Sequence, residues 1–332
     1  MADSSAPAAE APATTALPEP AEPLIDIDTE STFDGDSALG DDQSALTASL
    51  TSTVLNYPYE NGRRYHAYQQ GKYIMPNDEQ ENDRLDMAHH MMILRTDGKL
   101  HLAPIGKNPQ RILDLGTGTG IWCIEMGDEY PSAQILGNDL SPVQPTMVPP
   151  NVKFEVDDVE SEWTFTTPFD YIHCRYLATS IADWPGLVRK CSEHVAPGGW
   201  VEFQDYDMQY YSEDGSLKPE HAVARWIGLS IEASNDNGRT PSPGPQLKAW
   251  VQDAGFVDIH HQRLKLPIGR WPKDPQLKTV GAWNLLQILE GLEGFSMALF
   301  TRKLGWSHQE VQLLLAQVRA NLKDPAIHAQ LD

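Results

Sequence analysis

Short apolar stretches, separated by glycine, proline and charged residues, recur through the middle of the chain. Each stretch has the length of a strand and is apolar on both faces, which is typical of buried strands. The pattern predicts strands at 111–116, 133–140, 152–158, 169–175 and 199–207, and helices at 120–129 and 185–195. Since strands and helices alternate, we predict an α/β fold with a Rossmann-like, doubly wound, mostly parallel sheet covered by helices on both faces.

Helical spacing of apolar residues predicts further helices on either side of this alternating region. Before it, apolar residues recur at helical spacing from Leu85 to Met92, and we expect Pro76 and Asn77 to cap this helix and Gly98 to end it. After it, the pattern predicts helices at 218–235 and 246–256, a strand at 257–269 and a mostly helical tail over 271–332.

The composition changes near residue 56. Residues 1–55 hold eleven acidic residues and no Lys or Arg, and are rich in Ala, Pro, Ser and Thr. Such a segment cannot bury enough apolar surface to offset its chain entropy, so we predict that it is disordered. The chain then divides into this acidic tail (1–55), a helical lid segment (56–110), an α/β core (111–270) with a substrate-side insertion at about 206–245, and a C-terminal helical segment (271–332).

The formal net charge of −22 excludes some classes of partner. A strongly acidic chain gains nothing from neutralising phosphates, so we expect no direct binding of nucleic acid. Since no apolar run approaches the ~18 residues of a membrane span, we also expect no integral membrane segment. The three cysteines, Cys123, Cys174 and Cys191, are far apart and are predicted to be reduced thiols.

The stretch "RILDLGTGTGIW", which begins at Arg111, combines a strand, a glycine turn and the start of a helix. The dinucleotide fingerprint G-x-G-x-x-G would need a third glycine where Ile121 stands, and no Gly-Lys-Ser/Thr of a phosphate-binding loop follows. Asp114, two positions before the first glycine, would sit badly beside a pyrophosphate but suits an amine. These features favour S-adenosylmethionine, with an NAD-dependent reductase as the alternative.

Acidic residues also follow the next two predicted strands. Asp139 ends the second strand, where a carboxylate can bind ribose hydroxyls, and Asp157 and Asp158 end the third, where they can meet the adenine amine. Each aspartate taken singly could equally be a turn cap. Acids at three successive strand ends, in this order, together favour a methyltransferase.

Several motifs together resemble one family. "ILDLGTGTGIW", "PSAQILGNDLSPVQP", "YIMPNDEQENDRLD" and "VAPGGWVEFQDYD" are similar to the fungal LaeA-like class I S-adenosylmethionine-dependent methyltransferases. The resemblance covers residues 56–328. It implies a link to secondary metabolism and development, a velvet-type protein partner, and a nuclear location. The reduced thiols by themselves favour an intracellular protein, so a cytoplasmic location is expected as well.

Carried over to this sequence, the resemblance implies which residues hold the cofactor. Asp114 and the glycines would line its methionine end, Asp139 would bind the ribose, Asp158 and Val159 the adenine, and two tyrosines would belong to an N-terminal lid. The predicted cofactor-binding residues are Asp114, Gly116, Thr117, Gly118, Gly120, Asp139, Leu140, Asp158, Val159, Tyr65 and Tyr73.

One departure from the family concerns the end of the sheet. Members of the family continue into a last strand that ends in a Gly-x-Lys-Pro-like sequence, whereas this chain stops at Asp332. We therefore expect the last strand of the class I sheet to be missing, which would leave sheet edges unpaired or open to a partner chain.

The sequence indicates less clearly which residues bind the methyl acceptor or take part in catalysis. His173, Arg175 and Tyr210 are candidates for catalysis near the strand ends, although His173 could equally be a buried core histidine. Segments 56–95 and 206–240 carry aromatics that would shape the acceptor wall or simply pack. The pairs His89-His90 and His260-His261 lack further ligands at useful spacing, so we expect no metal.

Two hypotheses follow from the sequence. The first is a methyltransferase that acts on a small metabolite or a protein. The alternative is a regulatory subunit that keeps the fold and binds S-adenosylmethionine, but acts mainly through a velvet-type or other methyltransferase-complex partner.

Overall fold

The computed structural model describes residues 22, 24–26, 56–68 and 73–332. The prediction of a disordered tail over 1–55 therefore falls almost entirely outside the described residues.

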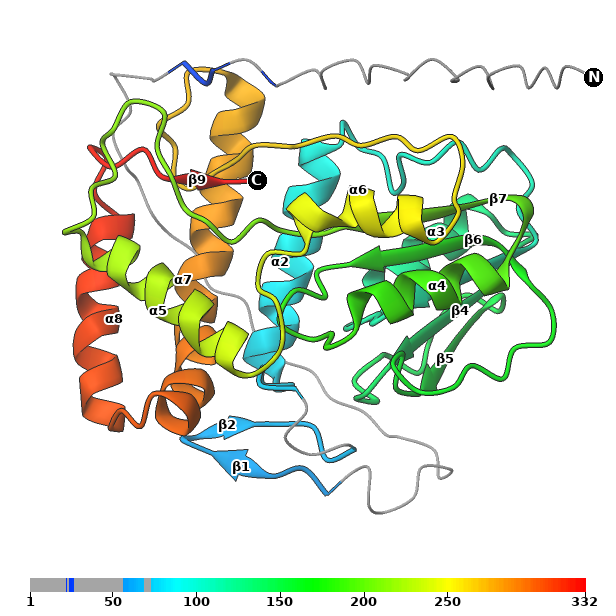
Figure 1. The fold of residues 1–332 in the computed structure, drawn as a ribbon, viewed down its shortest axis with the longest axis horizontal. Helices are drawn as coiled ribbons and strands as arrows, with labels where there is room; N and C mark the ends of the chain where they lie inside the picture. The colour runs from blue at the N-terminus through cyan, green and yellow to red at the C-terminus, as the bar shows by residue number, and fades with distance from the viewer. Residues whose placement is uncertain (1–21, 23, 27–55, 69–72) are drawn as a thin grey trace, which may run out of the picture.

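A five-stranded sheet forms the centre of one half of the molecule (Figure 1). Its strand order is β5-β4-β3-β6-β7, and every pair of neighbours is parallel. The strands are β3 (Arg111–Leu115), β4 (Gln134–Asp139), β5 (Val152–Val156), β6 (Phe169–Arg175) and β7 (Val195–Gln204). The chain starts at the central strand, builds outward through β4 and β5, and then returns to add β6 and β7. This order confirms the predicted doubly wound, Rossmann-like sheet. It also creates a switch point at β3, because β4 lies on one side of β3 and β6 lies on the other.

The remaining elements are helices and short strand pairs. The helices are α2 (Glu79–Arg95), α3 (Ile121–Glu129), α4 (Trp184–His194), α5 (Ala222–Asp236), α6 (Gly244–Asp253), α7 (Pro275–Lys303) and α8 (His308–Leu322). The short strands are β1 (Tyr59–Glu60), β2 (Arg63–Arg64), β8 (Leu266–Pro267) and β9 (Gln330–Leu331). No helix in the described ranges combines the length and the apolar character that a membrane crossing requires.

Alternation along β3 separates two apolar cores. Leu113 and Leu115 pack with Trp184 of α4 on one face of the sheet, whereas Ile112 packs with Trp122 of α3 on the other. Successive side chains of a strand point to opposite faces, so an apolar run buries both. This is why the continuous apolar pattern correctly predicted helices on both sides.

A third apolar core lies among the helices α2, α5, α7 and α8. Figure 1 shows α2 between the sheet on one side and α5, α7 and α8 on the other. Trp226 of α5 lies at this core, 1% exposed, and its indole N–H donates to the Ser296 hydroxyl of α7 at 2.8 Å. The C-terminal segment thus folds against α2, the helix that also reaches the sheet.

Replacing Trp226 with alanine is expected to lower the free energy of unfolding by about 3–5 kcal/mol, because the change removes a fully buried indole and leaves a cavity. Urea unfolding followed by circular dichroism measures the loss. Leu313→Ala on α8 is the control, since Leu313 is 68% exposed and its truncation should change stability by less than about 0.5 kcal/mol. Equal losses in the two variants would contradict a buried helical core.

The start and end of α2 differ from the prediction. Asp78, rather than Pro76 or Asn77, is the N-cap, and its carboxylate accepts the amide of Glu81 at 3.1 Å. Asp78 also pairs with the Arg63 guanidinium, which is a non-local contact that the sequence does not reveal. The helix ends at Arg95, and Gly98 closes it by donating its amide to the carbonyl of Ile93 at 2.7 Å.

The strand predicted at 257–269 is wrong for most of its length. Only Leu266 and Pro267 are in a strand, β8, which pairs antiparallel with β9. Val257, at the start of the predicted strand, is 81% exposed. The apolar residues of the alternating pattern therefore have no buried surface to pack against at this point. Within the described residues the central sheet gains no sixth strand, because Gln330 and Leu331 pair with β8 instead.

Candidate functional site

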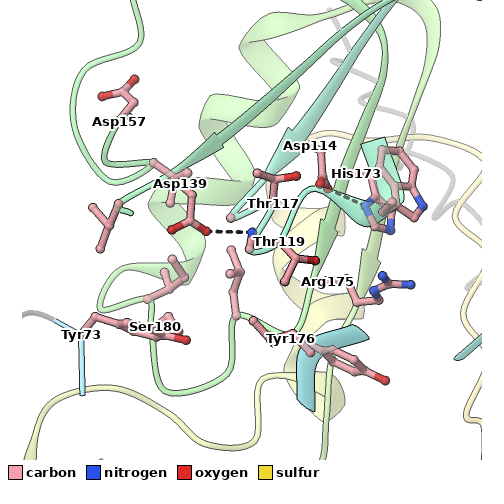
Figure 2. A pocket seen from close by; sticks show the side chains of 18 of the residues that line it. Tyr73, Asp114, Thr117, Thr119, Asp139, Asp157, His173, Arg175, Tyr176 and Ser180 are labelled. Carbon is pink, nitrogen blue, oxygen red and sulfur yellow. Dashed lines mark hydrogen bonds and ion pairs between the residues drawn. The ribbon is translucent and has the colours of Figure 1, made fainter. Parts of the chain in front are cut away.

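A cavity lies at the carboxyl ends of β3, β4, β5 and β6, with α2 along one side (Figure 2). This is the switch point of the sheet, where the loops after β3 and β6 diverge and leave room for a ligand. Its walls come from the glycine loop, the ends of the next strands, α2, and the segment after β6. The lining residues are Tyr73, Leu85, His89, Asp114, Gly116–Thr119, Ile121, Trp122, Asp139, Leu140, Asp157–Glu160, His173, Arg175–Leu177, Ser180, Ile181 and Arg239.

The loop between β3 and α3 requires glycine at its ends. Gly116 and Gly120 have φ of +66° and +80°, a region that L side chains rarely adopt. A Cβ on Gly116 would lie 2.5 Å from a methyl of Leu177, and one on Gly120 would lie 2.4 Å from Cζ of Phe154. Glycine is therefore required at both positions, and at Gly116 the backbone borders the cavity without a side chain.

Asp139 is held at the end of β4 by backbone amides. One carboxylate oxygen accepts the N–H of Gly118 and the other accepts the N–H of Ser141, both at 2.9 Å. Burial, with a smaller contribution from the charge of Asp114, raises the pKa of Asp139 to about 6, against the opposing effect of these hydrogen bonds. Each oxygen keeps a lone pair that can accept from a ligand hydroxyl.

Asp114 and His173 form a buried pair across neighbouring strands. The two residues are opposite each other in the parallel register of β3 and β6, and Asp114 Oδ1 lies 2.7 Å from His173 Nδ1. Trp122 stacks on the imidazole with ring centroids 3.9 Å apart. His173 Nε2 is buried and has no hydrogen-bond partner among the described residues.

Arg175 ends β6 and reaches α2. Its guanidinium donates to His89 Nδ1 at 2.7 Å, and His89 Nε2 lies 2.9 Å from a carboxylate oxygen of Glu125 in α3. Burial, with the nearby positive charge of Arg175, lowers the pKa of His89 to about 4, so the imidazole is neutral at physiological pH.

Helix α2 and the residues before it are tied to the loops that border the cavity. The Thr119 hydroxyl donates to Asp86 of α2 at 2.6 Å, and the Asn77 amide donates to the Ser141 hydroxyl at 3.1 Å. Tyr73 lines the cavity, and burial raises the pKa of its phenol. The N-terminal segment thus covers the loops after β3 and β4, as a lid would.

A family model described as a methyltransferase domain matches residues 87–261, which span the sheet and the cavity. Methyltransferase pytC of Aspergillus terreus is 48% identical over 292 residues, covering 88% of this chain and 90% of its own length. The secondary metabolism regulator LAE1 of Cochliobolus heterostrophus is 39% identical, covering 81% of this chain and 90% of its own length. The chain belongs to the LaeA-like class I S-adenosylmethionine-dependent methyltransferases.

A more distant likeness links this methyltransferase to a solved structure. Phosphoethanolamine N-methyltransferase 2 of Haemonchus contortus, in complex with S-adenosyl-L-methionine, is 19% identical with a TM-score of 0.40. The match covers 79% of this chain and 52% of that chain, so this chain spans about half the length of that protein.

The cavity of the methyltransferase fits its cofactor, S-adenosylmethionine, on two observations. Gly116 and Gly118 of the loop present backbone without side chains to the cavity, and a Cβ on Gly116 would lie 2.5 Å from a methyl of Leu177. The cavity also holds a carboxylate with spare acceptor capacity, Asp139, at one side and a buried imidazole nitrogen without a partner, on His173, at the other (Figure 2). When bound, S-adenosylmethionine supplies a methyl group activated on a positively charged sulfur.

Most of the residues predicted from the sequence come together at this cavity. Those that line it are Tyr73, Asp114, Gly116, Thr117, Gly118, Asp139, Leu140, Asp158 and Val159, with the catalytic candidates His173 and Arg175. Three others lie elsewhere. Gly120 is the N-cap of α3 and does not line the cavity. The Arg302 guanidinium lies over the ring of Tyr65, 5.1 Å from its centroid. Tyr210 packs edge-on against Trp226, with ring centroids 6.0 Å apart. Tyr65 and Tyr210 thus contribute to the packing of the helical segment. The sequence had left such packing open as the alternative to a place in the cavity wall.

Several lining residues were not predicted from the sequence. His89 was considered only as a metal ligand, and Trp122 and Arg239 were not considered at all. Arg239 pairs with Glu160 at 3.3 Å, and both residues line the cavity. No local sequence feature predicts that Arg239 lines the cavity. His89, in contrast, lies four positions after Leu85 in a helix, so the two side chains face the same side, and both line the cavity. In the part of the chain that the structure describes, no three His, Cys, Asp or Glu side chains converge to hold a metal.

Proposed function

We propose that this methyltransferase transfers the methyl group to a small-molecule acceptor within fungal secondary metabolism. One observation carries this proposal. A single cavity contains both the glycine loop and a wall formed by Tyr176, Ser180 and Ile181, to which none of the cofactor predictions assigns a role. A wall of this kind, in the same cavity as the glycine loop, suits a compact acceptor better than a protein surface does.

We propose the following cofactor contacts. Asp139 accepts the ribose hydroxyls, and Asp158 with Val159 borders the adenine. Asp114 uses Oδ1 for His173, which leaves Oδ2, contacted only by the weak Cys123 thiol donor at 3.5 Å, for the ammonium group of the methionine end. These assignments use lone pairs that the fold leaves available.

Alignment and exclusion of water are the main contributions of the chain to catalysis in this proposal. Asp205 accepts the amides of Leu177, Ala178 and Tyr206, which fixes the turn after β6 that forms the acceptor side. If the acceptor arrives protonated, the candidate base is His173, a residue of the cavity wall whose buried Nε2 has no hydrogen-bond partner among the described residues. No further proton carrier is required for an acceptor that is already deprotonated.

A regulatory role is the second proposal, and the likeness to a secondary metabolism regulator supports it. In this case the chain binds S-adenosylmethionine and acts through a protein partner, for which a velvet-type protein is the candidate. A nuclear location is proposed on the same resemblance, and a cytoplasmic location on the reduced thiols.

Methyl transfer from radiolabelled S-adenosylmethionine to a fungal extract tests the first proposal. Wild-type protein is expected to label a small molecule, and Gly118→Arg is expected to lose the label. The Gly118 amide donates to Asp139, and a side chain at this position points toward Leu85 of the lid. Gly215→Arg is the matched control, because Gly215 has a similar positive φ of +73° but no atom of the described chain within 4 Å of its Cβ position.

Label on a small molecule that depends on an intact Gly118 supports the enzyme. Cofactor binding without any label, together with stoichiometric co-purification of one protein from the producing fungus, would support the regulatory role and count against the first proposal.

A further inference from the structure

The cavity contains a cation whose charge is not matched by a carboxylate. Of its two arginines, Arg239 forms an ion pair with Glu160. Arg175 has no carboxylate within 4 Å in the described ranges, and its side-chain hydrogen-bond partner is the imidazole of His89. A partly buried guanidinium without a counter-ion is costly unless a ligand supplies the negative charge.

His89 holds this guanidinium in a fixed orientation. Since arginine only donates hydrogen bonds, His89 Nδ1 is the acceptor, and Nε2 therefore carries the proton that is donated to Glu125. His89 is 3% exposed and belongs to α2, whereas Glu125 belongs to α3. The contact occupies one terminal nitrogen of Arg175, and among the described residues its other N–H groups form no hydrogen bond.

The position of Arg175 in the cavity suggests what it meets. Figure 2 shows Asp139 and Asp157 at one side of the cavity and His173 and Arg175 at the other, with Thr117 and Thr119 between them. The acids would hold the ribose and adenine. The far side, where Asp114 can take an ammonium group, is thus also the side that offers a fixed guanidinium.

We propose that Arg175, oriented by His89, binds a carboxylate inside the cavity. Guanidinium and carboxylate match in charge and can form two parallel hydrogen bonds. The carboxylate comes from one of two sources, the amino-acid end of the cofactor or the methyl acceptor. This inference rests on the assignment of S-adenosylmethionine as cofactor.

Isothermal titration with two cofactor analogues tests the first source. S-adenosylhomocysteine carries the amino-acid end, and 5′-methylthioadenosine lacks it. Arg175→Gln is expected to weaken binding of S-adenosylhomocysteine by about 10- to 100-fold, the usual cost of losing a charged hydrogen bond, and to change binding of methylthioadenosine by less than about two-fold. Arg175→Lys should fall between wild type and Arg175→Gln. Arg189→Gln is the control, since Arg189 is an exposed arginine of α4 outside this cavity.

Benzoate, used as a carboxylate probe on protein saturated with S-adenosylhomocysteine, tests the second source. If the site serves the acceptor, benzoate raises the melting temperature of wild type and Arg189→Gln but not of Arg175→Gln, and both nucleosides bind all variants alike. Retained methylthioadenosine binding shows that Arg175→Gln is folded. If that variant does not fold, the ratio of the two nucleoside affinities in Arg175→Lys decides instead.

Unchanged S-adenosylhomocysteine affinity in Arg175→Gln, combined with no benzoate effect that depends on Arg175, would overturn the inference. Failure of wild-type protein to bind S-adenosylhomocysteine at all would instead overturn the cofactor assignment, so the two failures are distinct.

Discussion

Gly120→Ala is expected to reduce the affinity for S-adenosylhomocysteine at least about 100-fold and to destabilise the fold by about 2–5 kcal/mol. The alanine would need φ near +80°, and its Cβ would lie 2.4 Å from Cζ and 2.8 Å from Cε1 of Phe154. Gly120 does not line the cavity, but it sets the direction in which the loop enters α3. The loop backbone at Gly116 and Gly118 must then shift away from Asp139. Isothermal titration and urea unfolding measure the two effects.

Gly238→Ala separates backbone strain from the clash. Gly238 has a similar φ of +71°, and no atom of the described chain lies within 4 Å of its Cβ position. It should therefore lose only about 1 kcal/mol and keep its cofactor affinity. Adding Phe154→Ala to Gly120→Ala should recover part of the lost affinity. Equal effects of the two glycine substitutions, or no recovery, would show that contact with Phe154 does not position the loop.

Asp139→Asn is expected to weaken S-adenosylhomocysteine binding by about 100-fold at pH 8 and to remove most of its pH dependence between pH 5 and 7. In wild type the pKa of Asp139 is about 6, so the carboxylate is ionised above this pH and protonated below it. In the proposed complex the ribose hydroxyls donate to the ionised form, and binding therefore favours release of the proton. Wild-type affinity should be constant above pH 7 and fall by up to about ten-fold per pH unit below pH 6.

The sign of the stability effect separates binding from unfolding. Because the folded pKa of Asp139 lies above its ordinary value of 3.8, its contribution to stability is present below that value and is lost as pH rises through about 6. Loss of affinity at low pH therefore cannot come from unfolding driven by this group. Asp205, whose pKa burial raises to about 7, titrates in the same range. Only the component that disappears in Asp139→Asn belongs to Asp139, and a profile unchanged by that substitution would contradict its proposed role.

Local features of the sequence predicted the sheet and one side of the cavity. Apolar strands, helices between them and glycines at forced positive φ are properties of short segments, so they could be recognised without knowing the partners of each segment. Asp114, Asp139 and Asp158 could be placed because the carboxyl ends of parallel strands meet at one edge. The order of the strands along the chain was enough for this inference.

The predictions that failed all depended on a partner elsewhere in the chain. The alternation at 257–269 is real, but only Leu266 and Pro267 find a neighbouring strand, and it is β9 rather than the central sheet. Asp78 replaced Asn77 as the cap of α2, where it also binds Arg63 of the short hairpin. Tyr65 and Tyr210 have the aromatic character of a pocket wall but pack elsewhere.

The sequence by itself determined the family, the cofactor and the acidic residues that line the cavity from the ends of β3, β4 and β5, because each follows from the local chemistry of a strand end. Only the tertiary structure decided which residues line the opposite side of the cavity. The register of β3 against β6 pairs Asp114 with His173, and the packing of α2 brings His89 to Arg175 from 86 residues away. Register and helix packing depend on the summed burial of many side chains, and no single segment carries that information.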